Sequence, residues 1–115
     1  MTEMYQTTIT ISAVPEGDNI NFSVTDENDA KTPEFVGSQV TGVMMLLTRI
    51  LSKSYIGIIQ EKPELENEFS TQLLLTFKPE QPLSIEGSGI LAVYFAKALE
   101  AYYSDDPEFF AFLNS

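Results

Sequence analysis

The sequence contains no histidine, no cysteine and no tryptophan. Histidine is the usual side chain for acid–base catalysis near neutral pH and the commonest metal ligand, and cysteine supplies thiol chemistry and disulfides. Without them, a disulfide scaffold is excluded, and acid–base, thiol and soft-metal chemistry lose their commonest residues. We therefore predict no metal and no cofactor. The lack of cysteine fits a reducing compartment, and the first residues resemble no secretory signal, so we expect a cytoplasmic protein.

Basic residues are also scarce. Six Lys and Arg stand against 17 Asp and Glu, for a net charge of −11, and residues 1–30 and 98–115 hold no base at all. This balance opposes direct binding to nucleic acid phosphates and to anionic membranes. Residues 35–48 are uncharged, but fourteen residues are too few to span a bilayer. The charge suits either a solvated surface or a surface complementary to a basic protein.

The remaining composition is that of one folded domain. The chain has 115 residues, of which 43% are hydrophobic. A domain of this size buries enough surface to fold without a metal or a disulfide.

The first half predicts two strands and a helix. Residues 5–13 alternate between apolar and polar side chains, as in a half-buried strand, and residues 20–25 alternate again after the turn-forming segment 15–19. Thr32, followed by proline, is a good helix cap, and we predict a first long helix over residues 33–54.

The second half predicts the same order. Residues 69–78 alternate as a strand, a short strand follows at residues 83–85, and Ser88 would cap a second long helix over residues 88–103. Residues 64–78 could instead form a helix, since four of their apolar side chains are spaced four apart. We favour the strand because the alternation is longer and Pro79 follows it.

The predicted fold class is therefore α+β, with duplicated strand–strand–helix units. We expect a four-stranded antiparallel sheet with the two long helices on one face. Asp106 and Pro107 predict a short C-terminal helix at their edge. The other face of the sheet would be polar and nearly uncharged.

The first predicted helix has a narrow polar stripe with Met45 in its middle. Ile56 and Ile59 would enter that stripe if the helix continued to Gln60, and the helix would then be about 42 Å long. A compact domain of this size has a radius of gyration of only about 13 Å. We therefore expect the helix to end or kink near residues 54–57, or else Ile56 and Ile59 to face a second chain.

Motifs for chemistry are weak. Asp26–Asp29 is acidic, but it fails the spacing of a calcium-binding EF-hand loop. Gly87–Gly89 could hold an anion at a helix start, although it matches neither a P-loop nor a dinucleotide motif, and turn formation explains it better. Paired carboxylates remain available for catalysis, but most of them lie in predicted loops.

We therefore predict a small, non-catalytic protein-interaction or regulatory module whose partner the sequence does not identify. One alternative is an acidic inhibitor or nucleic-acid mimic that occupies a basic site; another is a carboxylate-based enzyme or a metal-dependent binder. The C-terminal aromatic residues could either dock on the protein's own core or anchor a partner. A homodimer built on the first helix and the residues after it is expected as well. The candidate interaction surface comprises Met45, Tyr55, Ile56, Ile59, Phe109, Phe110 and Phe112.

Overall fold

The computed structural model describes residues 4–27, 34, 36 and 38–114. The predicted order of two strands and a helix occurs in each half of the chain. The elements are β1 (Tyr5–Glu16), β2 (Asn19–Asp26), α1 (Gln39–Glu61), the short 3₁₀ helix η1 (Pro63–Glu66), β3 (Phe69–Phe77), β4 (Ser84–Glu86), α2 (Ile90–Tyr103) and α3 (Pro107–Leu113). The fold is α+β, as predicted.

The four strands form one sheet in the order β2-β1-β3-β4, and every neighbouring pair is antiparallel. The alternative helix over residues 64–78 is wrong. β3 pairs with β1 from Phe69 to Phe77, so its backbone hydrogen bonds are made across the sheet. Leu73 and Leu75 are buried and Gln72 is exposed, as the alternation predicted.

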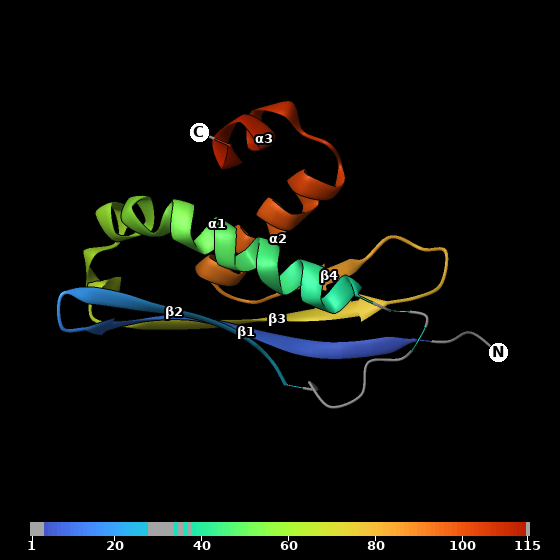
Figure 1. Ribbon diagram of the computed structural model, residues 1–115, viewed down its shortest axis with the longest axis horizontal. Coiled ribbons are helices and arrows are strands. Elements are labelled where there is room, and N and C mark those ends of the chain that lie inside the picture. The colour runs from blue at the N-terminus through green and yellow to red at the C-terminus, as the bar shows by residue number, and fades with distance from the viewer. Residues whose placement is uncertain (1–3, 28–33, 35, 37, 115) are drawn as a thin grey trace.

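The helices α1, α2 and α3 lie on one face of the sheet (Figure 1). α1 contacts β1 and β2, and α2 contacts β3 and β4. The core lies between the sheet and these two helices. Its fully buried large side chains include Ile9, Ile11, Val43, Leu47, Ile50, Leu51, Leu73, Leu75, Phe95 and Leu99.

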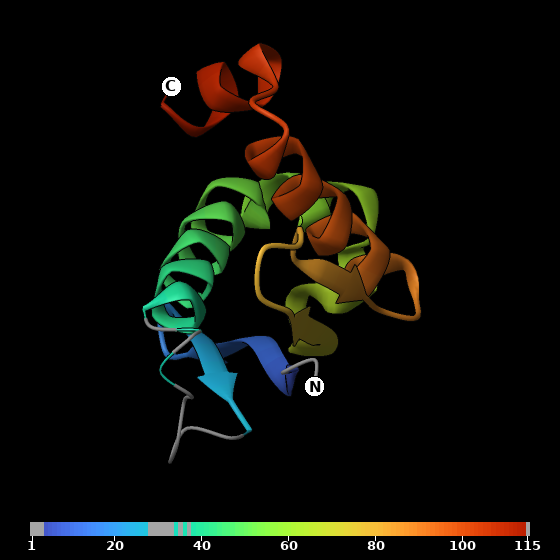
Figure 2. The same ribbon diagram turned by 90° about the vertical axis from the view of Figure 1, so that its right-hand side faces the viewer.

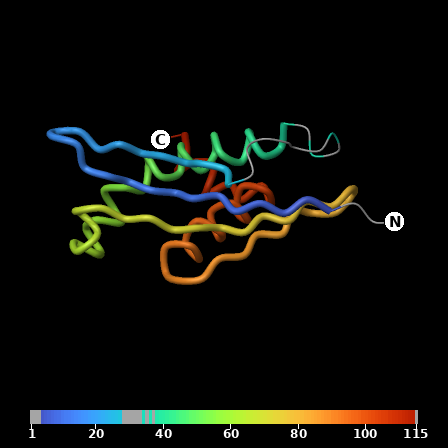
Figure 3. The backbone as a smooth tube through the Cα atoms, turned by 90° about the horizontal axis from the view of Figure 1, so that it is seen from below, coloured from blue at the N-terminus to red at the C-terminus, as the bar shows by residue number. Residues whose placement is uncertain are grey.

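The first helix differs from the prediction at both ends. Residues 32 and 33, the predicted start, lie outside the described residues, and α1 begins at Gln39. It then continues through residues 54–57 to Glu61, so the expected end or kink there is wrong. The reason is shape: the molecule measures 49 × 32 × 23 Å, and 23 residues of helix need about 34 Å. The long axis accommodates the helix (Figure 3).

The polar stripe on α1 is confirmed. Thr41, Met45, Thr48 and Ser52 are exposed, whereas the apolar residues on the other sides are buried or half-buried. α1 also has the length and hydropathy of a membrane-spanning helix, with a mean hydropathy of 1.4. A core helix meets the same criterion, and here the buried side chains of α1 form part of the core.

The second predicted helix spans Ile90–Tyr103, inside the predicted range 88–103, but with 14 residues against 23 in α1 it is a shorter helix and not a second long one. Its N-cap is Gly89, at φ 91°, and no side chain caps it, so the predicted role of Ser88 is wrong. Glycine supplies the left-handed backbone conformation that the entry into α2 requires.

The short C-terminal helix is confirmed, together with its cap. The Asp106 carboxylate accepts hydrogen bonds from the backbone N–H groups of Glu108 (2.9 Å) and Phe109 (3.4 Å). α3 packs against α1 and α2 on the side away from the sheet, rather than at their edge (Figures 1 and 2). Leu113 is buried there, and the Arg49 guanidinium donates to its carbonyl oxygen at 3.0 Å.

The open face of the sheet is polar and nearly uncharged, as predicted. Cross-strand side-chain hydrogen bonds join Gln6 to Thr76 (3.1 Å) and Gln72 to Thr10 (3.4 Å). Both bonds link β1 to β3 across this face.

Candidate functional site

The described residues include neither a cluster of acidic side chains suited to a metal ion nor a buried pair of carboxylates. They contain no group of three or more Asp and Glu side chains arranged to hold a metal ion. Asp26 is half-buried and accepts a hydrogen bond from the Thr7 hydroxyl, while Asn28 and Asp29 lie outside the described residues. Asp106, the cap of α3, is also half-buried, and the other described carboxylates are exposed. A carboxylate pair buried in a cleft, the arrangement that would favour an enzyme, is absent from the described residues.

The glycine segment before α2 serves packing. A Cβ at Gly87 would lie 2.7 Å from the Ala92 Cβ and 2.9 Å from the Leu73 Cδ2. Glycine at this position lets the chain pass closely between the sheet and the first turn of α2. Close approach therefore explains Gly87, and backbone conformation explains Gly89.

Acidic residues gather at one end of the molecule. The β1–β2 turn, the end of α1 and η1 all lie at this end (Figures 1 and 3). Among its described residues it carries a single lysine, Lys62, against six exposed carboxylates. We call this region the acidic end; its acids are Glu16, Asp18, Glu61, Glu64, Glu66 and Glu68. Such a concentration of one sign of charge attracts cationic groups.

The acidic end also contains an apolar groove of about 400 Å³. Its walls come from the β1–β2 hairpin, the last two turns of α1 and η1. We call it the hairpin groove; it is lined by Pro15, Gly17, Ile20, Tyr55, Ile56, Ile59, Gln60 and Glu66. Ile56 is the exposed apolar side chain of this lining, at 67% of its surface.

The predicted interaction residues on α1 fall into two groups. Tyr55 is half-buried, and its ring packs edge-on against Phe22 at 5.3 Å and stacks on Phe69 at 6.1 Å. Ile59 is likewise half-buried against the core. Met45, 69% exposed, and Ile56 remain on the surface. Only part of the segment from Tyr55 to Ile59 is therefore available to a partner.

The predicted C-terminal residues are divided in the same way. Phe109 and Phe110 are half-buried, and the Phe110 ring lies 5.2 Å from that of Tyr102. Phe112 is exposed beside Tyr94 of α2, where both residues line two adjacent grooves. α3 thus docks on its own core through one side and presents Phe112 on the other.

Sequence analysis missed the apolar side chains on the outer side of α2. Ile90, Val93 and Tyr94 are exposed, although the helix also buries Phe95 and Leu99 on its core side. The spacing i, i+3, i+4 of these three residues was the available signal, since it places them on one face of a helix.

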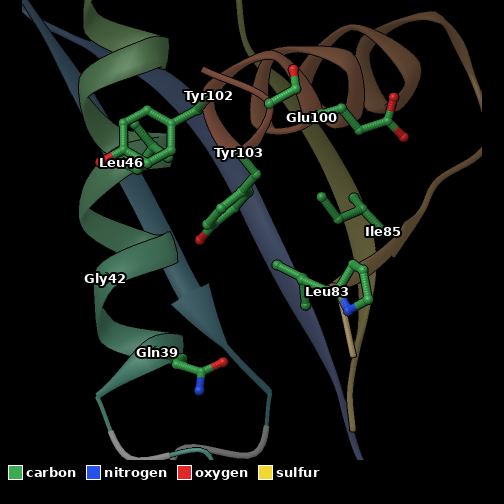
Figure 4. A pocket seen from close by; sticks show the side chains of 10 residues that line it. Gln39, Gly42, Leu46, Leu83, Ile85, Glu100, Tyr102 and Tyr103 are labelled. Carbon is green, nitrogen blue, oxygen red and sulfur yellow. The ribbon is translucent and has the colours of Figure 1, made fainter. Parts of the chain in front are cut away.

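Another cavity, of about 680 Å³, lies between the first turns of α1, the segment around β4 and the last turn of α2 (Figure 4). Leu46, Leu83 and Ile85 form apolar walls, and the Tyr103 ring projects between α1 and β4. Burial, and to a smaller extent the neighbouring Tyr102, raises the pKa of the Tyr103 phenol. The Tyr103 side chain is still 52% exposed, so this cavity is open to solvent.

The chain matches no protein-family model, no curated protein and no solved structure. Among the surfaces of the protein, the hairpin groove combines an exposed apolar side chain with a strong local charge.

Proposed function

We propose that the protein is a non-catalytic, cytoplasmic protein-interaction module that binds a basic, amphipathic segment of a partner protein at its acidic end. The observation that carries this proposal is the exposed Ile56 in an apolar groove at an end whose described residues include six exposed carboxylates and one lysine. An apolar centre with a charged rim is the common anatomy of protein interfaces.

The two parts of the groove would act differently. The apolar lining around Ile56 would take up one large apolar side chain of the partner and exclude water, which supplies most of the affinity. The surrounding carboxylates would attract Lys and Arg next to that side chain, raise the association rate and disfavour acidic competitors. We therefore expect a partner segment in which an apolar residue is flanked by basic residues.

This interpretation is better supported than the alternatives. A nucleic-acid mimic would need a charged surface without an apolar centre, because a phosphate-binding site offers mainly basic side chains. An enzyme that uses two carboxylates would need one of them desolvated in a cleft, whereas the described Asp and Glu side chains are exposed apart from two half-buried aspartates, each of which accepts a hydrogen bond.

The test compares two matched variants in affinity purification from the native host, read by mass spectrometry. Ile56→Lys puts a cation into the groove, and Met45→Lys makes the same change of charge at a site on α1 that is equally exposed, about 16 Å away. We expect a basic partner that the unmodified protein and Met45→Lys recover equally and Ile56→Lys recovers at least tenfold less.

The partner should also be released as salt is raised, since screening weakens attraction between exposed charges. Equal recovery by both variants would refute the role of the groove. A partner retained in high salt would refute the role of the carboxylates.

We also propose that the two strand–strand–helix halves are copies of one ancestral unit. The sheet order supports this idea, because β1 and β3 are central, β2 and β4 are at the edges, and each long helix covers its own pair of strands. The copies would have diverged, since β2 has eight residues and β4 has three. Superposition of Tyr5–Glu61 on Phe69–Tyr103 tests the idea, which fails if the corresponding strands do not align.

A further inference from the structure

The outer face of α2 is apolar although α2 already buries its opposite face. Ile90 is 69% exposed, and Val93 and Tyr94 are exposed one turn further along the same face. Phe112 of α3 is exposed beside Ile90 and Tyr94. Four large apolar side chains on one small area exceed the scattered single residues that are normal on a protein surface. We call this area the α2 face.

The α2 face has a ridge with a groove on each side. Tyr94 and Phe112 line both grooves, so they form the ridge between them. The groove toward the end of α1 has a volume of about 250 Å³ and includes Ile90 and Ile58. The groove toward α3 has a volume of about 490 Å³ and includes Ala98 and Ala101, whose small side chains leave room.

The ridge is held in place by its contacts. The Tyr94 hydroxyl donates to the buried Ser54 hydroxyl at 2.6 Å, and its ring packs edge-on against that of Phe95 at 5.3 Å. A side chain fixed in this way loses little conformational entropy on binding. The face is therefore preorganised for contact.

The charge of the α2 face differs from that of the molecule as a whole. Three lysines and three acids line the two grooves, so the face is formally neutral on a protein of net charge −11. The lysines are Lys53, Lys62 and Lys97, and the acids are Glu61, Asp106 and Glu108; Glu61 and Lys62 also belong to the acidic end, which adjoins this face. A surface of this kind offers no net electrostatic attraction to a strongly basic or a strongly acidic partner.

We propose that the occupant of the α2 face is a second copy of this chain, related by a two-fold axis. Around such an axis the same patch meets itself, so the ridge of one copy enters a groove of the other. The neutral charge matters here, because two chains of charge −11 repel each other over most of their surfaces and approach most easily where the charge is balanced. This dimer uses α2, not the stripe of α1 that the sequence suggested.

The test is sedimentation equilibrium of the unmodified protein and two charge-matched variants. Ile90→Glu and Met45→Glu each add one carboxylate at a site that is 69% exposed. Ile90 is the first residue of α2, and a carboxylate there is favourable to the helix, so this variant should fold. We expect the unmodified protein and Met45→Glu to sediment as dimers of the 12.8 kDa chain, and Ile90→Glu to raise the dissociation constant at least tenfold.

A monomer at high micromolar concentration of the unmodified protein overturns the proposal. The proposal is also overturned if both variants dissociate, if only Met45→Glu dissociates, or if both variants remain dimers. Salt separates the dimer from the proposed partner binding: added salt screens repulsion between the two copies and leaves the dimer intact, whereas it releases a basic partner. A dimer that dissociates in salt would contradict a neutral apolar interface.

Discussion

Gly87 offers a sharp test of how the sheet and α2 fit together. Substitution by alanine adds one methyl group at a point where the backbone passes between β3 and the first turn of α2. The new Cβ would lie 2.7 Å from the Ala92 Cβ, 2.9 Å from the Leu73 Cδ2 and 3.4 Å from the Gln72 carbonyl oxygen. Ordinary contact begins at 3.4 Å, so the first two distances are too short.

The magnitude follows from which neighbour can move. The Leu73 methyl group is the end of a side chain and could rotate, but Leu73 is fully buried in the core. The Ala92 Cβ is fixed to the α2 backbone, so α2 would have to move away from the sheet. Overpacking of this kind costs about 1–3 kcal/mol. For a domain of this size the melting temperature should fall by about 4–12 °C.

The control is Gly42→Ala, on α1. A Cβ at Gly42 meets nothing within 4 Å, and alanine is favoured over glycine in a helix by about 0.5–1 kcal/mol. Thermal unfolding followed by circular dichroism should therefore show opposite shifts for the two substitutions. An unchanged or higher melting temperature for Gly87→Ala would mean that α2 does not approach the sheet as closely as described.

Three further predictions concern the sheet, the last helix and the tyrosines. Leu75→Asp puts an unpaired charge in the core and should lower the free energy of unfolding in urea by about 3 kcal/mol or more, whereas Thr76→Asp on the open face should cost under about 1 kcal/mol; similar losses for both would argue against the strand. Asp106→Ala removes the α3 cap and should cost about 1 kcal/mol in the same assay, and Asp106→Asn should restore most of it because asparagine also caps helices. The phenol of Tyr103 should ionise above its ordinary pKa of 10.0 in an absorbance titration, since burial and then Tyr102 raise it. The folded state holds the phenol proton more tightly than the unfolded chain does, so the protonated phenol contributes stability below pH 10, and this stability is lost as the pH rises through the folded-state pKa. Tyr103→Phe should therefore remove part of the fall in the free energy of unfolding above pH 10. An identical fall in the variant would exclude Tyr103 as its cause.

Local signals in the sequence predicted much of the fold. The alternation in residues 5–13 and 69–77 predicted both central strands and their buried faces, because every second side chain of a strand points to the same face of the sheet. Asp106 predicted the cap of α3 because capping involves only neighbouring residues. The shortage of basic residues and the absence of histidine and cysteine likewise limit the chemistry that the protein can perform, whatever its fold.

Other properties depended on the tertiary arrangement. The length of α1 could not be read from its sequence, because a compact shape would require an earlier end, whereas the molecule is elongated along this helix. Ser88 has the chemistry of a cap, but the N-cap of α2 is Gly89, whose positive φ is set by the path of the chain from β4 into the helix.

The candidate surfaces needed the structure as well. The segment around Ile56 looked uniformly apolar, yet Tyr55 and Ile59 turn toward the core while Ile56 remains exposed in a groove whose other wall is the distant β1–β2 turn. Ile90, Val93 and Tyr94 were not singled out from the sequence, because only the packing of α2 shows that Phe95 and Leu99 are buried on the opposite face. Sequence periodicity determines which residues share a face of an element; which face is covered, and by what, is decided only when elements far apart in the chain pack together.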